Sequence, residues 1–214
     1  METLKMKFSY PFKAAGEKCV KEALSRPDFD PASLFRWGNM MAMSVIAMLK
    51  AAERELGEAG QKAMISALVN VGREIGRQML EGVEKPAGVE PIEMISAFAS
   101  WINREIYASP EDPRIKDADH CSFDILWCPH QDSYRAFDCR VQRYLVQGMI
   151  MAMRDKFPQA DFQVRFTQTI PAGGKVCNFE ISRKKPDEKD DWENYSDLLA
   201  KKALEKITSR KKGG

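Results

Sequence analysis

Two thiols and one imidazole lie in a single short stretch of the chain, CPHQDSYRAFDC, which covers residues 128–139. Cys128 and Cys139 form its two ends, and His130 is one of only 2 histidines in the protein. A thiolate beside an imidazole can act as a nucleophile with its base, whereas several thiolates with an imidazole can bind zinc. Free cysteines that pack as small hydrophobic residues are the third interpretation. Residue types alone leave all three open.

A third cysteine, Cys177, is expected to join this group. It lies in KVCNFEIS, where alternation places Cys177, Phe179 and Ile181 on the inward face of a strand. The stretch 128–139 lacks the closely spaced CxxC or HxxxH pairs of structural zinc sites. No metal is therefore expected, and zinc or iron on the cysteine and histidine cluster is kept as an alternative. The other cysteines and histidine are expected to be structural or exposed: Cys19, Cys121 and His120.

Charged residues near the thiols have candidate roles in catalysis and binding. His130 is the natural base, because the pKa of an unperturbed imidazole lies near neutrality. Asp138 adds a carboxylate beside Cys139. Arg165 alternates with the core residues of a predicted strand, from which it could hold a substrate carboxylate through two hydrogen bonds. The alternative for Arg165 is a solvated cross-strand charge.

The first half of the chain is expected to be mainly helical. One helix begins at Asp30 and Pro31, and residues 56–60, LGEAG, separate it from a second helix over residues 61–82. A third helix covers residues 91–107, followed by a loop over residues 108–120. Apolar residues at helical spacing predict one buried face on the first helix: Leu34, Trp37, Met41, Val45, Met48 and Leu49. Two glycines at one face of the second helix could let another backbone approach: Gly72 and Gly76.

The second half of the chain has strand periodicity around one more helix. Residues 121–128 predict a strand, 133–157 a helix, and 160–170 with 175–182 a hairpin whose turn uses positive φ at Gly173 and Gly174. Cys128 then ends a strand and Cys139 lies in the first half of the helix. If that helix crosses the sheet, Cys139 can face Cys177.

These elements predict an α+β fold, in which N-terminal helices pack on a small antiparallel sheet and the C-terminal half is a βαββ unit. We expect one domain over residues 1–185, mainly helical over 1–110, with the βαββ unit at 120–183. Residues 186–214 are expected to be a charged linker and a C-terminal helix.

Composition excludes several classes of function. The 33 Lys and Arg against 31 Asp and Glu leave a net charge of +2, so no overall field favours nucleic acid. The longest apolar run is too short to span a membrane, and the N-terminus does not resemble a signal peptide. Five cysteines, an odd number, predict free thiols and a cytosolic location. The expected partner is a small molecule, with a homo-oligomer as a possible assembly.

The arrangement of these motifs resembles the L-2-amino-thiazoline-4-carboxylic acid hydrolase family. The resemblance rests on a strand ending in LWCP, a helix carrying DCRVQRYLVQG and the sequence TIPAGGKVCNFEI, within residues 30–182. One departure is Gln142, which stands where the family usually has an aspartate. The positions that match the family pattern are Cys128, Cys139, Thr169, Gly173, Cys177 and Phe179.

The resemblance implies a hydrolase of a small cyclic amidine or thiazoline carboxylate that opens a C–N bond to give an N-carbamoyl product. In that reaction an inward thiolate, Cys177 or Cys139, attacks the amidine carbon or polarises it for water. His130 or Asp138 moves the proton. Residues at the substrate would be Arg165, Gly173 and Phe179. Because Gln142 departs from the pattern, a different substrate or no catalysis at all is also open.

The same hairpin resembles 4-vinyl-reductase-type small-molecule-binding domains, which also have a glycine-containing helix and a final C-x-F strand. That resemblance implies a ligand-binding or sensing domain without catalysis, in which the cysteines line the binding site. A zinc-stabilised scaffold is the third possibility.

Overall fold

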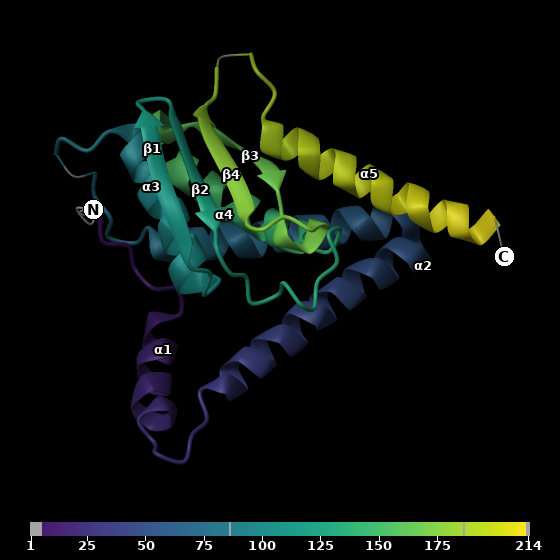
Figure 1. The fold of residues 1–214 in the computed structure, drawn as a ribbon, viewed down its shortest axis with the longest axis horizontal. Coiled ribbons are helices and arrows are strands. Elements are labelled where there is room, and N and C mark those ends of the chain that lie inside the picture. The colour runs from purple at the N-terminus through teal and green to yellow at the C-terminus, as the bar shows by residue number, and fades with distance from the viewer. Residues whose placement is uncertain (1–5, 86, 186, 213–214) are drawn as a thin grey trace.

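The protein has an α+β fold, as predicted, in a computed structural model that describes residues 6–85, 87–185 and 187–212 (Figure 1). The helices are α1 (Lys13–Cys19), α2 (Ala32–Met79), α3 (Pro91–Trp101), α4 (Arg140–Lys156) and α5 (Asp191–Lys212). The strands are β1 (Glu111–Asp117), β2 (His120–Ile125), β3 (Phe162–Gln168) and β4 (Cys177–Arg183). They form one antiparallel sheet in the order β1-β2-β4-β3. A π-helical turn, Ile102–Ile106, continues α3.

One face of the sheet is buried under α3 and α4, and the other is polar. Along β2 and β4, the inward residues include Phe123 and Phe179, whose rings stack with centroids 4.7 Å apart. The outward residues of the same strands form cross-strand polar contacts, such as the Asn178 Nδ2 hydrogen bond to Asp124 Oδ1 at 2.6 Å. Because the sheet is covered on one side only, an inward face of three apolar residues suffices for β2 and for β4.

The two predicted N-terminal helices are one long helix, α2, with an interruption at the predicted boundary. The backbone at Gly57 has φ 62° and ψ −138°, which is non-helical. The prediction that residues 56–60 break the helix is therefore confirmed as a kink. The carboxylate of Asp30 accepts the backbone N–H of Ala32 at 2.9 Å, so Asp30 caps the helix start as expected.

The first part of α2 does not have the buried face that its periodicity predicts. Ile46 and Leu49 are buried, whereas several large apolar side chains remain exposed: Leu34, Trp37, Met41 and Met48. Together with α1, which was not predicted, this part of α2 projects from the rest of the molecule (Figure 1). A periodic apolar pattern predicts a face that can be buried, but among the residues that the structure describes no other element covers most of this one.

Glycines allow the second part of α2 to lie against α4, as predicted. A Cβ atom added at Gly72 would clash with the carbonyl group of Leu145, and one added at Gly148 would clash with that of Val69. At Gly76 the same atom would lie 2.9 Å from the Cα of Met149. Each mid-helix glycine costs about 1 kcal/mol in helix propensity, which the close packing of the two backbones offsets.

The predicted loop at residues 108–120 is wrong in part, because residues 111–117 form β1. This strand pairs with β2 at the edge of the sheet, with Pro113 opposite Phe123. Its sequence, EDPRIKD, has no apolar alternation because most of its side chains are exposed. Proline and charged residues are tolerated on an edge strand, which needs hydrogen bonds on one side only.

The segment between β2 and α4 is longer than predicted. β2 ends at Ile125, whose partner Cys177 is the first residue of β4, so beyond it no neighbouring strand continues the ladder. α4 begins at Arg140, and residues 126–139 form a series of turns, including one closed by the Tyr134 N–H to the His130 carbonyl at 2.8 Å. Cys128 therefore lies in this loop, and Cys139 is the N-cap of α4.

The β3–β4 hairpin is confirmed, with a wider connection than a tight turn. Residues 169–176 join the strands through the short 3-10 helix Ile170–Ala172. Gly173 has φ 95°, as expected, but Gly174 does not adopt a positive φ, so that prediction is wrong. Gly174 instead closes the turn by donating its N–H to the Thr169 carbonyl at 3.0 Å.

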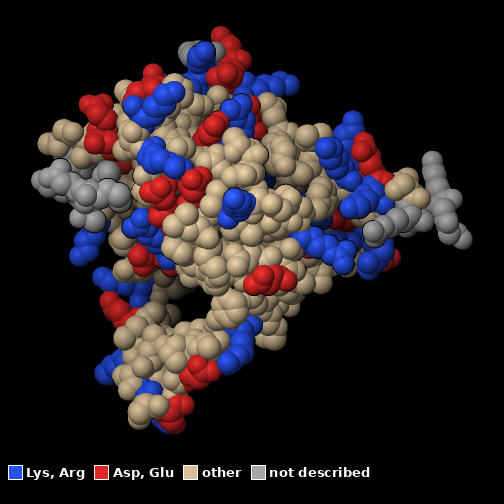
Figure 2. All heavy atoms as spheres, in the orientation of Figure 1, with Lys and Arg blue, Asp and Glu red and all other residues tan. Residues whose placement is uncertain are grey.

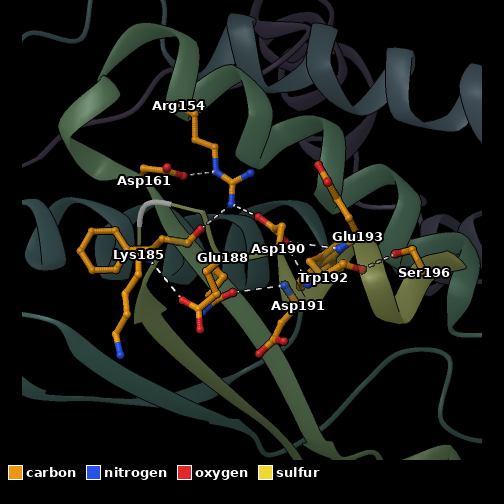
Figure 3. Close-up of polar contacts among 11 residues, drawn as sticks. Arg154, Asp161, Lys185, Glu188, Asp190, Asp191, Trp192, Glu193 and Ser196 are labelled. Carbon is orange, nitrogen blue, oxygen red and sulfur yellow. Dashed lines mark hydrogen bonds and ion pairs between the residues drawn. The ribbon is translucent and has the colours of Figure 1, made fainter. Parts of the chain in front are cut away.

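The C-terminal helix α5 is attached to the body through its first turn (Figure 3). Asp190 Oδ1 accepts the Trp192 N–H at 2.9 Å, and Asp190 Oδ2 pairs with Arg154 of α4. Arg154 also contacts Asp161 at 3.1 Å. Trp192 itself is 3% exposed and belongs to the main core cluster, so α5 contributes a core residue rather than only a surface helix.

Charges of both signs are interspersed on the face seen in Figure 2, with uncharged surface between them. This distribution agrees with the net charge of +2. Among the described residues, none of the helices combines the length and the hydropathy that crossing a membrane requires.

Candidate functional site

A cavity of about 110 Å³ lies between the covered face of the sheet and helices α3 and α4. The loop at 126–139 and the first turn of α5 also contribute to its walls. Most of the lining is aliphatic or aromatic, as in ligand-binding cavities generally, with a few polar groups among them. The predicted site residues that line it are Cys128, His130, Cys139, Cys177 and Phe179, together with Thr169.

Three thiols meet at this cavity from three different elements. Cys128 comes from the loop, Cys139 from the N-cap of α4 and Cys177 from the start of β4. Burial raises the pKa of all three above the ordinary thiol value. Charge on Cys128 would also raise the pKa of Cys139 and Cys177, and charge on Cys177 that of Cys139. For Cys128 burial is the only cause that raises the pKa. At neutral pH the three are therefore neutral thiols.

The hydrogen bonds around the three thiols differ. The backbone N–H groups of His130 and Gln131 both lower the pKa of Cys128, in opposition to burial. Cys177 Sγ accepts one such bond, from the Ile170 N–H at 3.2 Å. Burial raises the pKa of Cys139 to about 12. Cys128 is thus the thiol whose anion the surrounding backbone would stabilise most.

His130 is held by a residue that the sequence did not indicate, Asn39 of α2. The His130 Nδ1 lies 3.1 Å from Asn39 Oδ1, and the Asn39 amide is oriented by its Nδ2 hydrogen bond to the Phe35 carbonyl at 3.2 Å. Because Asn39 Oδ1 can only accept, Nδ1 carries the proton and Nε2 is left as the basic nitrogen. Burial lowers the pKa of His130, so its ring is neutral at neutral pH.

The ring of His130 is also fixed by stacking on Tyr134, with centroids 4.6 Å apart and an angle of 14° between planes. Tyr134 OH in turn accepts the Gln142 Nε2 at 2.9 Å. Gln142 lines the cavity, and its Oε1 is buried without a hydrogen-bond partner. Tyr107 OH, another group at the cavity, is buried without a partner as well.

A guanidinium group is present at the cavity, but it belongs to Arg143 and not to Arg165. Arg143 of α4 is 4% exposed and lines the cavity. Its guanidinium lies over the rings of Phe166, Trp192 and Tyr195 at 4.3, 4.5 and 4.2 Å. Burial lowers the pKa of Arg143 to about 10, which still leaves a cation at neutral pH.

Three predicted site residues do not reach the cavity. Arg165 lies on the exposed face of β3, where it pairs with Glu180 at 2.5 Å, which is the cross-strand alternative considered above. Asp138 pairs with Lys50 at 2.6 Å and faces a different surface depression, between α2, α4 and α5. Gly173 shapes the turn before β4 and is not part of the cavity wall. None of these three lines the cavity, although the charge of Asp138 still acts on its chain neighbour Cys139.

The remaining cysteines lie apart from this cavity, and all five are free thiols. Cys121 is buried in the core and Cys19 lies at the end of α1. His120 is exposed and pairs with Asp117 at 2.8 Å. Within residues 6–85, 87–185 and 187–212, no three His, Cys, Asp or Glu side chains are grouped so as to hold a metal ion.

A one-layer antiparallel sheet covered by helices, with a thiol-lined cavity between the layers, defines the protein as an α+β protein with an internal cavity. Residues 37–181 match the family model described as L-2-amino-thiazoline-4-carboxylic acid hydrolase, and the chain belongs to that family. The chain is also 48% identical over 202 residues to an uncharacterized protein of Archaeoglobus fulgidus. The aligned region covers 92% of this chain and 89% of that relative. Asn39, Cys128, His130, Arg143 and Cys177 all fall within the matched residues.

Proposed function

We propose that this protein hydrolyses a small cyclic amidine that carries a carboxylate, of which 2-aminothiazoline-4-carboxylate is the representative named by its family. The observation that carries the proposal is the convergence of three thiols and one neutral imidazole on a single, largely apolar cavity. A nucleophile and a base held together in this way are the parts that nucleophilic catalysis requires.

In the first step the thiol of Cys128 adds to the amidine carbon. His130 Nε2 takes the thiol proton as the Sγ–C bond forms, and the ring C–S bond breaks. The proton passes from His130 to the departing ring sulfur, which becomes a thiol. The product of this step is an isothiourea on Cys128 that retains every atom of the substrate. Cys128 is favoured as nucleophile because two backbone N–H groups oppose the rise in its pKa that burial causes.

In the second step water adds to the same carbon with His130 as the base. The Sγ–C bond breaks, one proton of water returns to Sγ and the other remains on nitrogen, which leaves a urea. The product is then an N-carbamoyl aminothiol. Atom balance shows that a thiazoline gives an N-carbamoyl product by opening its C–S bond, since both nitrogen atoms stay on the carbon. The expected C–N opening applies only to a cyclic amidine without ring sulfur.

Asn39 acts in this scheme as a positioning residue. Its hydrogen bond to Nδ1 fixes the tautomer of His130 that has a basic Nε2. Because burial lowers the pKa of His130 below the ordinary 6.5, the base is fully neutral at neutral pH. Activity is therefore expected to fall only as the pH is lowered through that depressed pKa.

The test is to replace each thiol and the imidazole and to measure ring opening, which releases a titratable thiol from the substrate. We expect His130→Ala to reduce kcat by roughly 10²–10⁴-fold, the usual contribution of general acid–base catalysis, and Cys128→Ala to reduce it further. When the parent chain is quenched with acid during turnover, mass spectrometry should detect Cys128 with the full mass of the substrate added, and Cys128→Ala should lack this adduct. Cys19→Ala, distant on α1, is the matched control and should retain full activity.

Full activity in the alanine variants of Cys128, Cys139 and Cys177 would show that no thiol takes part. A ligand-binding or sensing domain is the second candidate, favoured by the raised pKa of all three thiols, which disfavours the thiolate that a nucleophile needs. Such a domain would bind the ring compound without turnover and would tolerate His130→Ala.

A further inference from the structure

Arg143 is a buried cation without an anionic partner among the described residues. Its Nε and Nη1 have no hydrogen-bond partner, although the side chain is 4% exposed. The neighbouring buried Arg140, by contrast, pairs with Glu53 at 2.6 Å. The groups whose charge acts on Arg143 are two tyrosines and Cys139, with no carboxylate among them.

The aromatic rings around Arg143 hold its guanidinium without using its hydrogen bonds. Rings from β3 and α5, those of Phe166, Trp192 and Tyr195, lie about the cationic carbon within 4.5 Å. Trp192 Nε1 also donates to the Arg143 carbonyl at 3.1 Å, which fixes the backbone at this position. A ring over the face of a guanidinium leaves the N–H groups in its plane free to bind an anion in a forked geometry.

Burying an ionised group without a hydrogen-bonded counter-ion is unfavourable, and native structures rarely do so without a reason. Arg143 is such a buried ionised group without a counter-ion, and it lies at the wall of the cavity rather than inside a packed core. The buried Oε1 of Gln142, the preceding residue of α4, is an acceptor without a donor, and its amide is fixed by the Nε2 hydrogen bond to Tyr134. The residues of the cavity wall thus include both unused donors and an unused acceptor.

We propose that Arg143 binds the carboxylate of the small molecule in this cavity, while Gln142 Oε1 accepts an N–H from the same molecule. This inference rests on the proposed function, because it takes the cavity as the substrate site. It adds the chemical class of the ligand, a compact amidino or amino carboxylate. At 10–15 Å³ for each water-sized group, the 110 Å³ cavity has room for roughly 7–11 such groups.

The experiment compares two probes that differ only in the anion: 2-amino-2-thiazoline-4-carboxylate and 2-amino-2-thiazoline. Binding is measured by calorimetry in full-length Cys128→Ala, so that turnover does not interfere. We expect the carboxylate to bind roughly 10–100-fold more tightly, the effect of a charge-assisted hydrogen bond, and Arg143→Met to remove this preference. Arg143→Lys, which keeps the charge but loses the fork, should retain part of it.

Arg165→Met is the matched control, because Arg165 is also an arginine near Phe166 in sequence but lies on the exposed face. It should keep the full preference for the carboxylate. Circular dichroism of each variant verifies that it is folded. A preference that survives Arg143→Met, or equal binding of both probes by the parent protein, would overturn the inference.

Two further outcomes separate this inference from the proposed hydrolase. If the preference depends on Arg143 but the parent chain opens no ring, the carboxylate site stands and the hydrolase is wrong. If neither ring compound binds, acetate, benzoate and proline are tested at millimolar concentration by thermal shift. Stabilisation of the parent chain but not of Arg143→Met would retain the anion site with another ligand. No stabilisation by any of them would overturn it.

Discussion

The surroundings of Cys139 and Cys128 at the cavity affect the pKa of the two thiols differently. Burial, together with the smaller effect of charge on Cys177 and Cys128, raises the pKa of Cys139 to about 12. A thiol in this state packs as a small apolar group and supports the shape of the cavity. Cys128 lies at the same cavity, yet backbone N–H groups oppose the effect of burial. Position relative to the backbone therefore opposes the rise in pKa more at Cys128 than at Cys139.

This difference predicts how the stability of the fold depends on pH. Above the ordinary thiol pKa of 9.0, Cys139 ionises in the unfolded chain but stays protonated in the native state until about pH 12. The native state then binds more protons, so the free energy of unfolding falls as the pH rises through this window. Urea unfolding at pH values on both sides of 9.0 should show a shallower decline in Cys139→Ala than in the parent chain.

The control for this measurement is Cys19→Ala, which removes a thiol from α1 outside the cavity and should leave the pH dependence of the free energy unchanged. An equal decline in the parent chain and Cys139→Ala would contradict the prediction.

At the scale of elements, the contact between α2 and α4 determines where the site residues of α4 lie. Cys139, Gln142 and Arg143 all face the cavity from the start of α4, and glycines further along hold that helix against α2. The buried pair of Arg140 and Glu53 joins the same two helices. A shift of α4 away from α2 would therefore displace three cavity groups at once.

We predict that Gly148→Ala destabilises the fold and weakens ligand binding together. The added Cβ clashes with the backbone of α2 at Val69, and forcing such helices apart costs about 1–3 kcal/mol, more than the ~1 kcal/mol gained in helix propensity. Gly38→Ala, within α2 but with nothing within 4 Å of the new Cβ, should instead leave stability equal or higher. Thermal unfolding checks both, and equal melting temperatures for the two variants would refute the role of close packing.

At the scale of the whole molecule, the site depends on a helix that lies beyond the residues shared with the family. The family match ends at residue 181, whereas Trp192 of α5 lines the cavity and contacts Arg143. The polar contacts in Figure 3 fasten the start of α5 to α4 through Asp190 and Arg154. The docking of the C-terminal helix therefore helps to form the wall of the cavity.

We predict that Asp190→Ala releases α5 and weakens carboxylate binding. The variant loses an N-cap, which costs about 1 kcal/mol, and leaves Arg154 without its buried partner, which adds to the loss. Limited trypsin digestion should then cleave α5 faster at its lysines. Asp161→Ala removes the more exposed partner of the same arginine and should cost less than about 1 kcal/mol. Equal digestion of both variants would contradict the model of docking through Asp190.

The sequence by itself determined the elements whose pattern is local. The start of α2 at Asp30, helix α3, the inward face of β4 with Cys177 and Phe179, and the glycines at the helix contact could all be read from periodicity and capping residues. These features depend on neighbours a few residues apart, so side-chain pattern reports them directly. The grouping of Cys128, His130, Cys139 and Cys177 was predicted from the same local patterns, because these patterns placed each residue on its strand, turn or helix.

Only the tertiary structure decided which polar groups complete the site. Asn39 reaches His130 across 91 residues of sequence, and the edge strand β1 exists because β2 pairs with it. Arg143 could have been noticed, since it follows Cys139 by one helical turn on an otherwise apolar face, but Arg165 has a similar alternation and lies outside. A local pattern shows that a charge lies on a face, whereas the packing of distant elements decides whether a counter-ion meets it there.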